Sequence, residues 1–254
     1  MNPHPNIVEI IGVPGVGKSS VFKELCNEWN SKQKWTHLDA LINQGKTKSN
    51  GFINQSINLI KRFLKVKKHQ SFEINKGIQY AHNNEVLSQF FWQHLSNTEF
   101  EANADPALRF RSAFFLYRDF CRYQAIHDNA NGIPCIMDEG FLQKSFLVHK
   151  DKKIIEAVLD DYLSLIQLPK AVIWVHVRPI HIILDRIKMR KKRIASHIDL
   201  GDEMLKIETK KWMRLIKLLI KKVEQKGVRI YKIDGRDSIE NNVKKVKSIL
   251  SSLS

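Results

Sequence analysis

Short apolar runs alternate with longer segments of helical periodicity along this chain. The runs predict five strands, at residues 7–11, 35–38, 133–137, 171–177 and 228–233. The run at 171–177 is apolar on both sides, which is typical of a buried parallel strand. Because strands that alternate with helices form parallel sheets, the pattern predicts an α/β fold: a five-stranded parallel sheet with helices on both faces. In such a sheet, ligands bind at the carboxyl ends of the strands.

Helical periodicity fills the intervals between the strands. It predicts helices over residues 19–29, 53–66, 72–95 (one or two helices), 105–125, 147–166 and 203–222. Asp105 and Pro106 are a typical helix start, since Asp caps free N–H groups and Pro fits the first helical position. Ser238 is expected to cap a terminal helix in the same way. One stripe of the 105–125 helix is apolar, and we interpret it as core in preference to a base-stacking surface. Its members are Phe110, Phe114, Tyr117 and Cys121.

No repeat, low-complexity tract or linker divides the chain, and 254 residues suit one domain. We therefore predict a single domain over residues 1–254. Residues 41–104 contain no strand pattern and are interpreted as a helical insertion between the early strands. One predicted helix of this insertion ends in a basic cluster, which is usually only a solvated face. The cluster consists of Lys61, Arg62, Lys65, Lys67 and Lys68.

The first strand leads into a phosphate-binding motif. Gly12 ends the strand, four residues follow, and Gly17-Lys18-Ser19 opens a helix, which is the P-loop pattern GxxxxGK[ST]. Glycine lets the backbone approach an anion closely, Lys18 would reach the β- and γ-phosphates, and the Ser19 hydroxyl would bind Mg²⁺. The alternative is an accidental Gly-rich turn, which the strand-then-helix setting disfavours. The predicted nucleotide-binding residues of this loop are Gly12, Pro14, Gly15, Val16, Gly17, Lys18, Ser19 and Ser20.

A second apolar strand, at 133–137, ends in the acidic pair Asp138 and Glu139. A Walker B element requires such an acid, because Mg²⁺ keeps several waters and needs a carboxylate beside the phosphates. We assign Asp138 to Mg²⁺, directly or through water. Glu139 is expected either to polarise an attacking hydroxyl or water, or to hold a neighbouring basic residue.

Four arginines accompany the apolar stripe of the 105–125 helix: Arg109, Arg111, Arg118 and Arg122. Arg111, Arg118 and Arg122 lie seven and four residues apart, near one helical face. Such a row can bind phosphate or carboxylate oxygens bidentately, and we take these residues as candidates for acceptor binding. The alternative is ordinary surface arginine paired with an acid such as Asp119. Asp39, after the predicted second strand, is a further acceptor candidate, with a surface turn as its alternative.

The net charge of +16 fits an anionic acceptor, nucleic acid or an acidic membrane surface, and it fits a solubilising surface equally well. Cys26, Cys121 and Cys135 form no CxxC pair, which argues for a reducing compartment and against a disulfide framework or a cysteine-rich zinc site. No apolar run is long enough to span a bilayer, and the first residues do not have the pattern of a signal peptide. We therefore predict a cytoplasmic protein without a transmembrane segment.

The order of these features resembles that of the P-loop kinases of the thymidylate kinase, nucleoside monophosphate kinase and deoxynucleoside kinase group. The resemblance covers most of the chain in layout, although only four short stretches match as motifs. It implies a P-loop NTPase fold, with ATP and Mg²⁺ as cofactors. The segment Phe115-Leu116-Tyr117-Arg118 is similar to the place where this group carries a substrate-binding arginine, so Arg118 inherits that role.

Two more stretches carry the resemblance in the second half of the chain. The strand and helix up to Arg193 look like the approach to an arginine-rich lid, here residues 178–200. Arg186 and Arg190 lie four residues apart on one helical face and inherit the role of lid arginines that close over the phosphates. Asp234-Gly235 resembles the loop that lies against the adenine. His176, before the lid, is interpreted as a hydrogen-bonded core histidine in preference to a catalyst.

One departure leaves the acceptor unidentified. Thymidylate kinases commonly carry Asp-Arg after the third strand and deoxynucleoside kinases carry Glu-Arg, whereas this chain has Asp138-Glu139-Gly140. Neither subgroup therefore fits, and residues 41–104 contain no recognisable acceptor motif.

The combined features predict a phosphotransferase that moves the γ-phosphate of ATP·Mg²⁺ to a hydroxyl or phosphate of a small acceptor, nucleoside-, nucleotide- or sugar-like. The predicted catalytic residues are Lys18, Glu139, Arg186 and Arg190. The alternatives are an ATPase in which Glu139 activates water, and a polynucleotide 5′-hydroxyl kinase. Nucleic acid is not favoured as a partner, because no nucleic-acid-binding signature accompanies the basic charge. A homodimer is left open. The absence of Asn-Lys-x-Asp, HExxH and GxSxG motifs disfavours a GTPase, a metalloprotease and a serine hydrolase.

Overall fold

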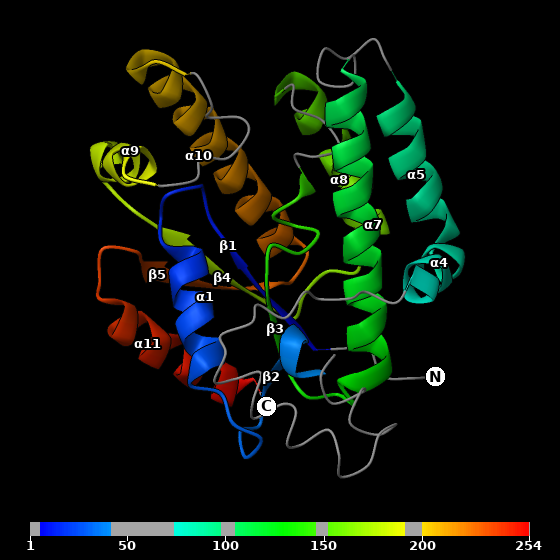
Figure 1. The fold of residues 1–254 in the computed structure, drawn as a ribbon, viewed down its shortest axis with the longest axis horizontal. Coiled ribbons are helices and arrows are strands. Elements are labelled where there is room, and N and C mark those ends of the chain that lie inside the picture. Colours follow the sequence, from blue (N-terminus) through cyan, green and yellow to red (C-terminus); the bar gives the residue numbers. More distant parts are fainter. Residues whose placement is uncertain (1–5, 42–73, 98–104, 146–151, 191–199, 254) are drawn as a thin grey trace, which may run out of the picture.

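A computed structural model describes residues 6–41, 74–97, 105–145, 152–190 and 200–253 (Figure 1). Five strands form one sheet in the order β2-β3-β1-β4-β5, and every pair in it is parallel. The strands are β1 (Ile7–Ile11), β2 (Thr36–His37), β3 (Cys135–Asp138), β4 (Ala171–His176) and β5 (Arg229–Asp234). This confirms the predicted α/β fold and its five-stranded parallel sheet.

The register of the central strands brings the candidate chemistry to one edge of the sheet. Ile10 lies opposite Asp138, and Ile11 lies opposite Trp174. All five residues of β1 are buried, as expected for a strand covered on both faces. The loop that follows β1 therefore emerges between the ends of β3 and β4.

Helices cover both faces of this sheet (Figure 1). The helices α1 (Lys18–Asn27) and α11 (Ile239–Ser252) pack against each other on one face. The other face carries α7 (Pro106–Asn129), α8 (Lys152–Leu165) and α10 (Asp202–Gln225). Two shorter helices, α4 (Ile74–Asn83) and α5 (Glu85–Ser96), pack on α7, and α9 (Ile180–Lys188) lies at the carboxyl end of the sheet.

The predicted helix starts are confirmed by their caps. The Asp105 carboxylate accepts hydrogen bonds from the N–H groups of Ala107 and Leu108, with Pro106 at the first helical position. The Ser238 hydroxyl accepts one from Asn241 N–H. Each cap satisfies donors that the first turn of a helix leaves free, which fixes where α7 and α11 begin.

The interpretation of the α7 stripe as core is wrong for its first half. Phe110 is 77% exposed and Phe114 is 57% exposed, whereas Cys121 is buried. The reason lies in the partner helix: α4 covers only the second half of the stripe, where a Cβ on Gly77 would lie 2.6 Å from the Tyr117 ring. Several buried residues of α7 form a different stripe. It consists of Ser112, Leu116, Asp119, Phe120 and Tyr123.

Two predicted segments lie partly outside the described residues. Of the 41–104 insertion, the structure describes residue 41 and residues 74–97, so the Lys61–Lys68 cluster lies outside. Of the 178–200 segment it describes 178–190 and 200, which leaves Arg193 outside. Within the described ranges, no helix is both long and apolar enough to cross a membrane.

Candidate functional site

The loop between β1 and α1, Gly12 to Ser19, has the backbone of a cradle. Gly15 and Gly17 adopt φ of 95° and 98°, which side chains rarely allow. A Cβ on Gly12 would lie 2.5 Å from the carbonyl oxygen of Val175, so the loop packs directly on the end of β4. The ten-residue helix α1 begins at Lys18 with no acidic residue in its first turn. Its N-terminus therefore presents uncompensated N–H groups, which favour an anion.

Lys18 connects this loop to the two acids that follow β3. Its Nζ donates to Glu139 Oε1 at 2.6 Å and lies 3.9 Å from Asp138 Oδ1. The lysine is only 7% exposed, so its charge is held in a partly desolvated place by these two carboxylates. The sequence predicted these three residues separately, and the structure brings them together.

The two acids differ in their proton affinity. Burial raises the pKa of Asp138 above its ordinary value, partly offset by Lys18 and by a hydrogen bond with the Ser19 hydroxyl. Burial also acts on Glu139, but the charge and hydrogen bond of Lys18, together with Lys144 and Arg122, bring its pKa below the ordinary value. Glu139 is therefore ionised at neutral pH. Its backbone φ of 59° is unusual for a residue with a side chain.

Arg122 holds the backbone of the acidic pair. Its terminal nitrogens donate to the Asp138 carbonyl at 2.8 Å and to the Glu139 carbonyl at 3.1 Å. One of them also donates to Asp119 Oδ1 at 3.0 Å, and Asp119 is in turn bound by Lys144 Nζ at 2.6 Å and 2.5 Å. The pairing with Asp119 is the alternative that the sequence left open, but the pair is buried, not superficial. Acceptor binding by Arg122 stays a prediction.

Two residues that sequence reasoning missed position the loop from below. Gln143 Oε1 accepts the N–H of Gly12 at 2.9 Å. The fully buried Glu9 accepts the backbone N–H groups of Gln143 at 2.7 Å and Leu142 at 3.2 Å. Burial raises the pKa of Glu9 to about 7, although these two N–H groups lower it. The one available signal was a glutamate inside the otherwise apolar run Ile7–Ile11.

Two of the acceptor candidates meet over one aromatic ring. The guanidinium carbons of Arg111 and Arg118 lie 5.4 Å and 4.9 Å from the centre of the Phe115 ring, and Lys144 Nζ lies at 6.0 Å. Arg118 Nε is buried and has no hydrogen-bond partner among the described residues. Burial lowers the pKa of Arg118, while the charges of Asp119 and Glu139 raise it. The cations around Phe115 thus form a positively charged surface beside Glu139, and Arg118 Nε is a hydrogen-bond donor that a ligand could use.

On the other side of the loop, Arg186 ties it to the segment after β5. Its guanidinium donates to the Val16 carbonyl at 3.3 Å and to the Gly235 carbonyl at 2.9 Å. The Asp234 carboxylate is bound by its neighbour Arg236, whose hydrogen bonds lower the pKa of Asp234 to about 2. Arg190 is exposed at the end of α9 and lies apart from these contacts.

The remaining candidate, Asp39, is half-buried just after β2. Burial, together with the nearby charges of Asp39 and Asp138, raises the pKa of the Cys26 thiol to about 12. Asp39 and Asp138 thus both lie near Cys26. Within the described ranges, no group of three or more His, Cys, Asp or Glu residues is arranged to hold a metal ion.

Comparison with known proteins adds no assignment. No protein-family model matches the chain, and no curated protein matches it. The kinase resemblance therefore depends on the motifs and on the geometry around the Gly12–Ser19 loop.

Proposed function

We propose that the protein is a phosphotransferase with a P-loop NTPase fold, similar to the thymidylate and nucleoside monophosphate kinases, which transfers the γ-phosphate of ATP to a small anionic acceptor. The observation that carries the proposal is the position of Lys18. It lies at the mouth of a glycine cradle, within 2.6 Å of Glu139 and 3.9 Å of Asp138. A lysine at a helix N-terminus beside two carboxylates is the arrangement that a triphosphate and its metal ion require.

The donor phosphates are expected to occupy the Gly12–Ser19 loop. Phosphate oxygens would compete with Glu139 for Lys18, which moves from a protein carboxylate to the β- and γ-phosphates. Arg186 is proposed to sit beside the base, because it already joins Val16 of the loop to Gly235. Gln143 keeps the loop in place by accepting the N–H of Gly12, and Glu9 keeps Gln143 in place by accepting its backbone N–H.

Asp138 and Ser19 fit the role of Mg²⁺ ligands. Asp138 Oδ1 is buried and has no hydrogen-bond partner among the described residues, and Ser19 shares a hydrogen bond with the same carboxylate. One carboxylate and one hydroxyl suit a hard ion that keeps most of its waters. When bound, Mg²⁺ would supply charge neutralisation between the phosphates. Arg122 fixes the backbone position of Asp138 by donating a hydrogen bond to its carbonyl oxygen.

The acceptor is proposed to bind between Glu139 and the arginines around Phe115. Arg118 has a buried nitrogen without a partner and lies beside Glu139, so an anionic group of the acceptor would satisfy it. Once Lys18 moves to the phosphates, the ionised Glu139 is free to accept the proton of the acceptor hydroxyl. Arg190, exposed at the end of α9, is proposed to close over the phosphates and exclude water.

The test is transfer of labelled phosphate from γ-labelled ATP to a panel of nucleosides, nucleotides, sugars and oligonucleotides. We expect transfer to at least one small acceptor, loss of that transfer in Lys18→Ala, and full transfer in Lys244→Ala, an exposed lysine on α11. Arg118→Ala should raise the KM of the acceptor and leave that of ATP unchanged.

Other outcomes identify the alternatives. Release of phosphate that is equally fast with and without every acceptor of the panel would show an ATPase. Transfer to oligonucleotides alone would show a polynucleotide kinase. A protein that neither binds nor consumes ATP would refute the proposal.

A further inference from the structure

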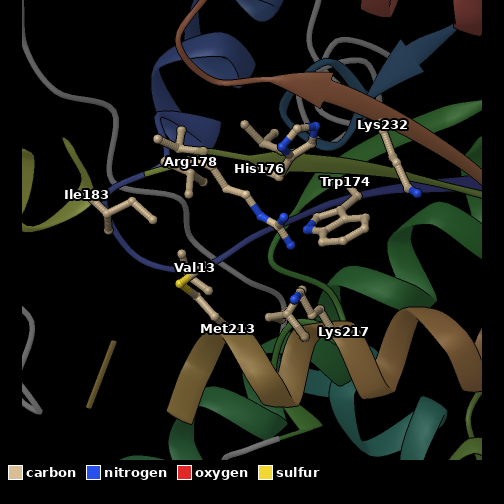
Figure 2. Close-up of a pocket in the computed structure, with 12 residues that line it drawn as sticks. Val13, Trp174, His176, Arg178, Ile183, Met213, Lys217 and Lys232 are labelled. Carbon is tan, nitrogen blue, oxygen red and sulfur yellow. The ribbon is translucent and has the colours of Figure 1, made fainter. Parts of the chain in front are cut away.

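A cavity of about 290 Å³ lies on the α10 face of the sheet, beside the carboxyl ends of β4 and β5 (Figure 2). We call it the α10 cavity. The residues that line it come from five parts of the chain: the loop after β1, the end of β4 with the two residues that follow it, α9, α10 and β5. They include Val13, Trp174, Arg178, Met213, Lys217 and Lys232.

Among the described residues, no acid compensates the positive charge around the α10 cavity. Arg178, Lys217 and Lys232 are all exposed at its rim, and its described lining contains no Asp or Glu. Within the described part of the chain, no ion pair or side-chain hydrogen bond engages any of the three. Cations gathered without a counterion repel one another, so the site gains free energy when an anion arrives.

The walls are apolar and include one large ring. Trp174 is half-buried, and Lys232 Nζ lies 5.4 Å from the centre of its ring. Figure 2 shows the Arg178 guanidinium and the Trp174 ring directed into the space above α10, where Lys217 and Met213 project towards them. A flat ring that stacks on Trp174 would keep its polar substituent within reach of these cations.

Of the residues proposed for the nucleotide, Val16 alone lines this cavity. Lys18, Arg186 and Glu139 do not line it, whereas Val13 and Val16 do. The cavity therefore touches the Gly12–Ser19 loop through two valine side chains and lies beside it. Its volume is at the small end of the range for ligand sites, which suits a single ring.

We propose that the α10 cavity is a separate binding site for a small aromatic oxyanion: one ring that carries a carboxylate or a phosphate monoester. The ring stacks on Trp174 between Val13 and Met213. The oxyanion lies among Arg178, Lys217 and Lys232. Because Val13 and Val16 belong to the Gly12–Ser19 loop, an occupant contacts that loop from the α10 side.

The experiment uses the Lys18→Ala chain, in which the proposed nucleotide site cannot hold a phosphate firmly. Phenyl phosphate and benzoate are titrated separately by saturation-transfer NMR, and the comparison of their Kd values distinguishes a phosphate site from a carboxylate site. Benzyl alcohol is the uncharged control. We expect either anion to bind more tightly than the alcohol.

Variants place the binding in the α10 cavity. Lys217→Ala and Lys232→Ala should each weaken the tighter anion about threefold, the scale of one exposed ion pair. Trp174→Leu should weaken it more, and Lys244→Ala, on the opposite face, should leave it unchanged. The proposal fails if both cavity lysine variants bind like the parent chain, or if benzyl alcohol binds equally well. It also fails if ATP·Mg²⁺ displaces the probe competitively from the wild-type protein, since the cavity would then belong to the nucleotide site.

Discussion

Two cation-rich regions lie at the same edge of the sheet and treat their charges in opposite ways. Beneath the Gly12–Ser19 loop, Lys18, Arg122 and Lys144 are each paired with a carboxylate of Glu139 or Asp119, mostly out of contact with water. We call this group the paired cluster. Around the α10 cavity, Arg178, Lys217 and Lys232 are exposed, and the described residues that line the cavity include no Asp or Glu.

The difference teaches what each region is built to do. A buried charge without a partner costs several kcal/mol, so each charged group of the paired cluster is held next to its partner. The cluster therefore fixes the positions of Asp138, Glu139 and Lys18. Exposed cations cost little, because water screens them, and they stay available for a ligand. The paired cluster therefore fixes the positions of its side chains, whereas the exposed cations around the α10 cavity can attract an anionic ligand.

The strongest way to break the paired cluster is Asp119→Asn. Asp119 is the common partner of Arg122 and Lys144, and its removal leaves two buried cations without a counterion. We expect a loss of about 3–5 kcal/mol in the free energy of unfolding, measured by urea denaturation at pH 7. Asp160→Asn, which breaks the exposed pair with Lys222, is the matched control and should cost at most about 1 kcal/mol. Equal losses in the two variants would show that the cluster contributes no more than a surface ion pair.

The sequence predicted those parts of the fold and the candidate site that follow from local patterns. The loop, Lys18, Asp138 and Glu139 follow from local motifs, because phosphate and magnesium binding require fixed residue types at fixed spacing. The sheet follows from the alternation of strands and helices. The motif residues and the individual strands and helices can each be recognised from residues that are close together in the sequence.

The supporting contacts depend instead on residues far apart in the chain. Gln143 binds Gly12 across 131 residues, and no periodicity indicates that pairing. The α10 cavity draws Trp174, Lys217 and Lys232 from three elements, so it exists only after the sheet and α10 have packed. Phe110 and Phe114 were misassigned for the same reason, since the position of α4 decides which turns of α7 are covered.

The pH dependence of stability tests whether the buried Glu9 carboxyl is protonated in the folded protein. The pKa of Glu9 is about 7 in the folded protein, against an ordinary value of 4.5. Between these two values the unfolded chain releases the proton and the folded chain retains it, so stability falls as pH rises from about 4.5 to about 7 and is level above. The loss is on the order of 3 kcal/mol.

Glu9→Gln should remove this loss, because glutamine keeps the shape of the protonated acid. Urea denaturation at pH 4.5 to 8 is expected to show wild type losing stability relative to the variant as pH rises. The exposed Glu224→Gln variant is the control and should follow wild type at every pH. A stability difference between Glu9→Gln and wild type that does not change with pH would contradict the raised pKa.

The contact between the two regions is tested at Gly235. A Cβ there would lie 2.2 Å from the Val16 carbonyl oxygen and 2.8 Å from a Val177 methyl group. Gly235→Ala should therefore push the loop away, weaken both hydrogen bonds of Arg186, and cost about 1–3 kcal/mol of stability. Gly201→Ala, with nothing within 4 Å of the added methyl, is the control; because Gly201 is the N-cap of α10, thermal unfolding should find only the loss of up to about 1 kcal/mol that alanine causes at such a position. If both variants unfold alike, the close approach at Gly235 is not a constraint.

The smallest expected effect belongs to the unpaired cations. Lys217→Ala removes one of three like charges and should raise stability by a few tenths of a kcal/mol at low ionic strength, a gain that disappears in high salt. Lys222→Ala, whose lysine is paired with Asp160, should instead lower stability slightly. Unfolding midpoints at low and high salt measure both. A loss of stability in Lys217→Ala that salt relieves would reveal an anionic partner for Lys217 within the chain.

The central claim is that the Gly12–Ser19 loop and its paired cluster hold the phosphates of ATP. Calorimetric titration of ATP tests this claim most directly. The titration uses wild type, Lys18→Ala and Asp138→Asn, each with and without Mg²⁺. The account predicts that wild type binds more tightly with Mg²⁺ than without it. It predicts that Asp138→Asn loses that Mg²⁺ dependence and that Lys18→Ala binds at least about tenfold more weakly, the scale of one charge-assisted contact of about 1.4 kcal/mol or more. Equal affinity in all three proteins, with or without Mg²⁺, would contradict it.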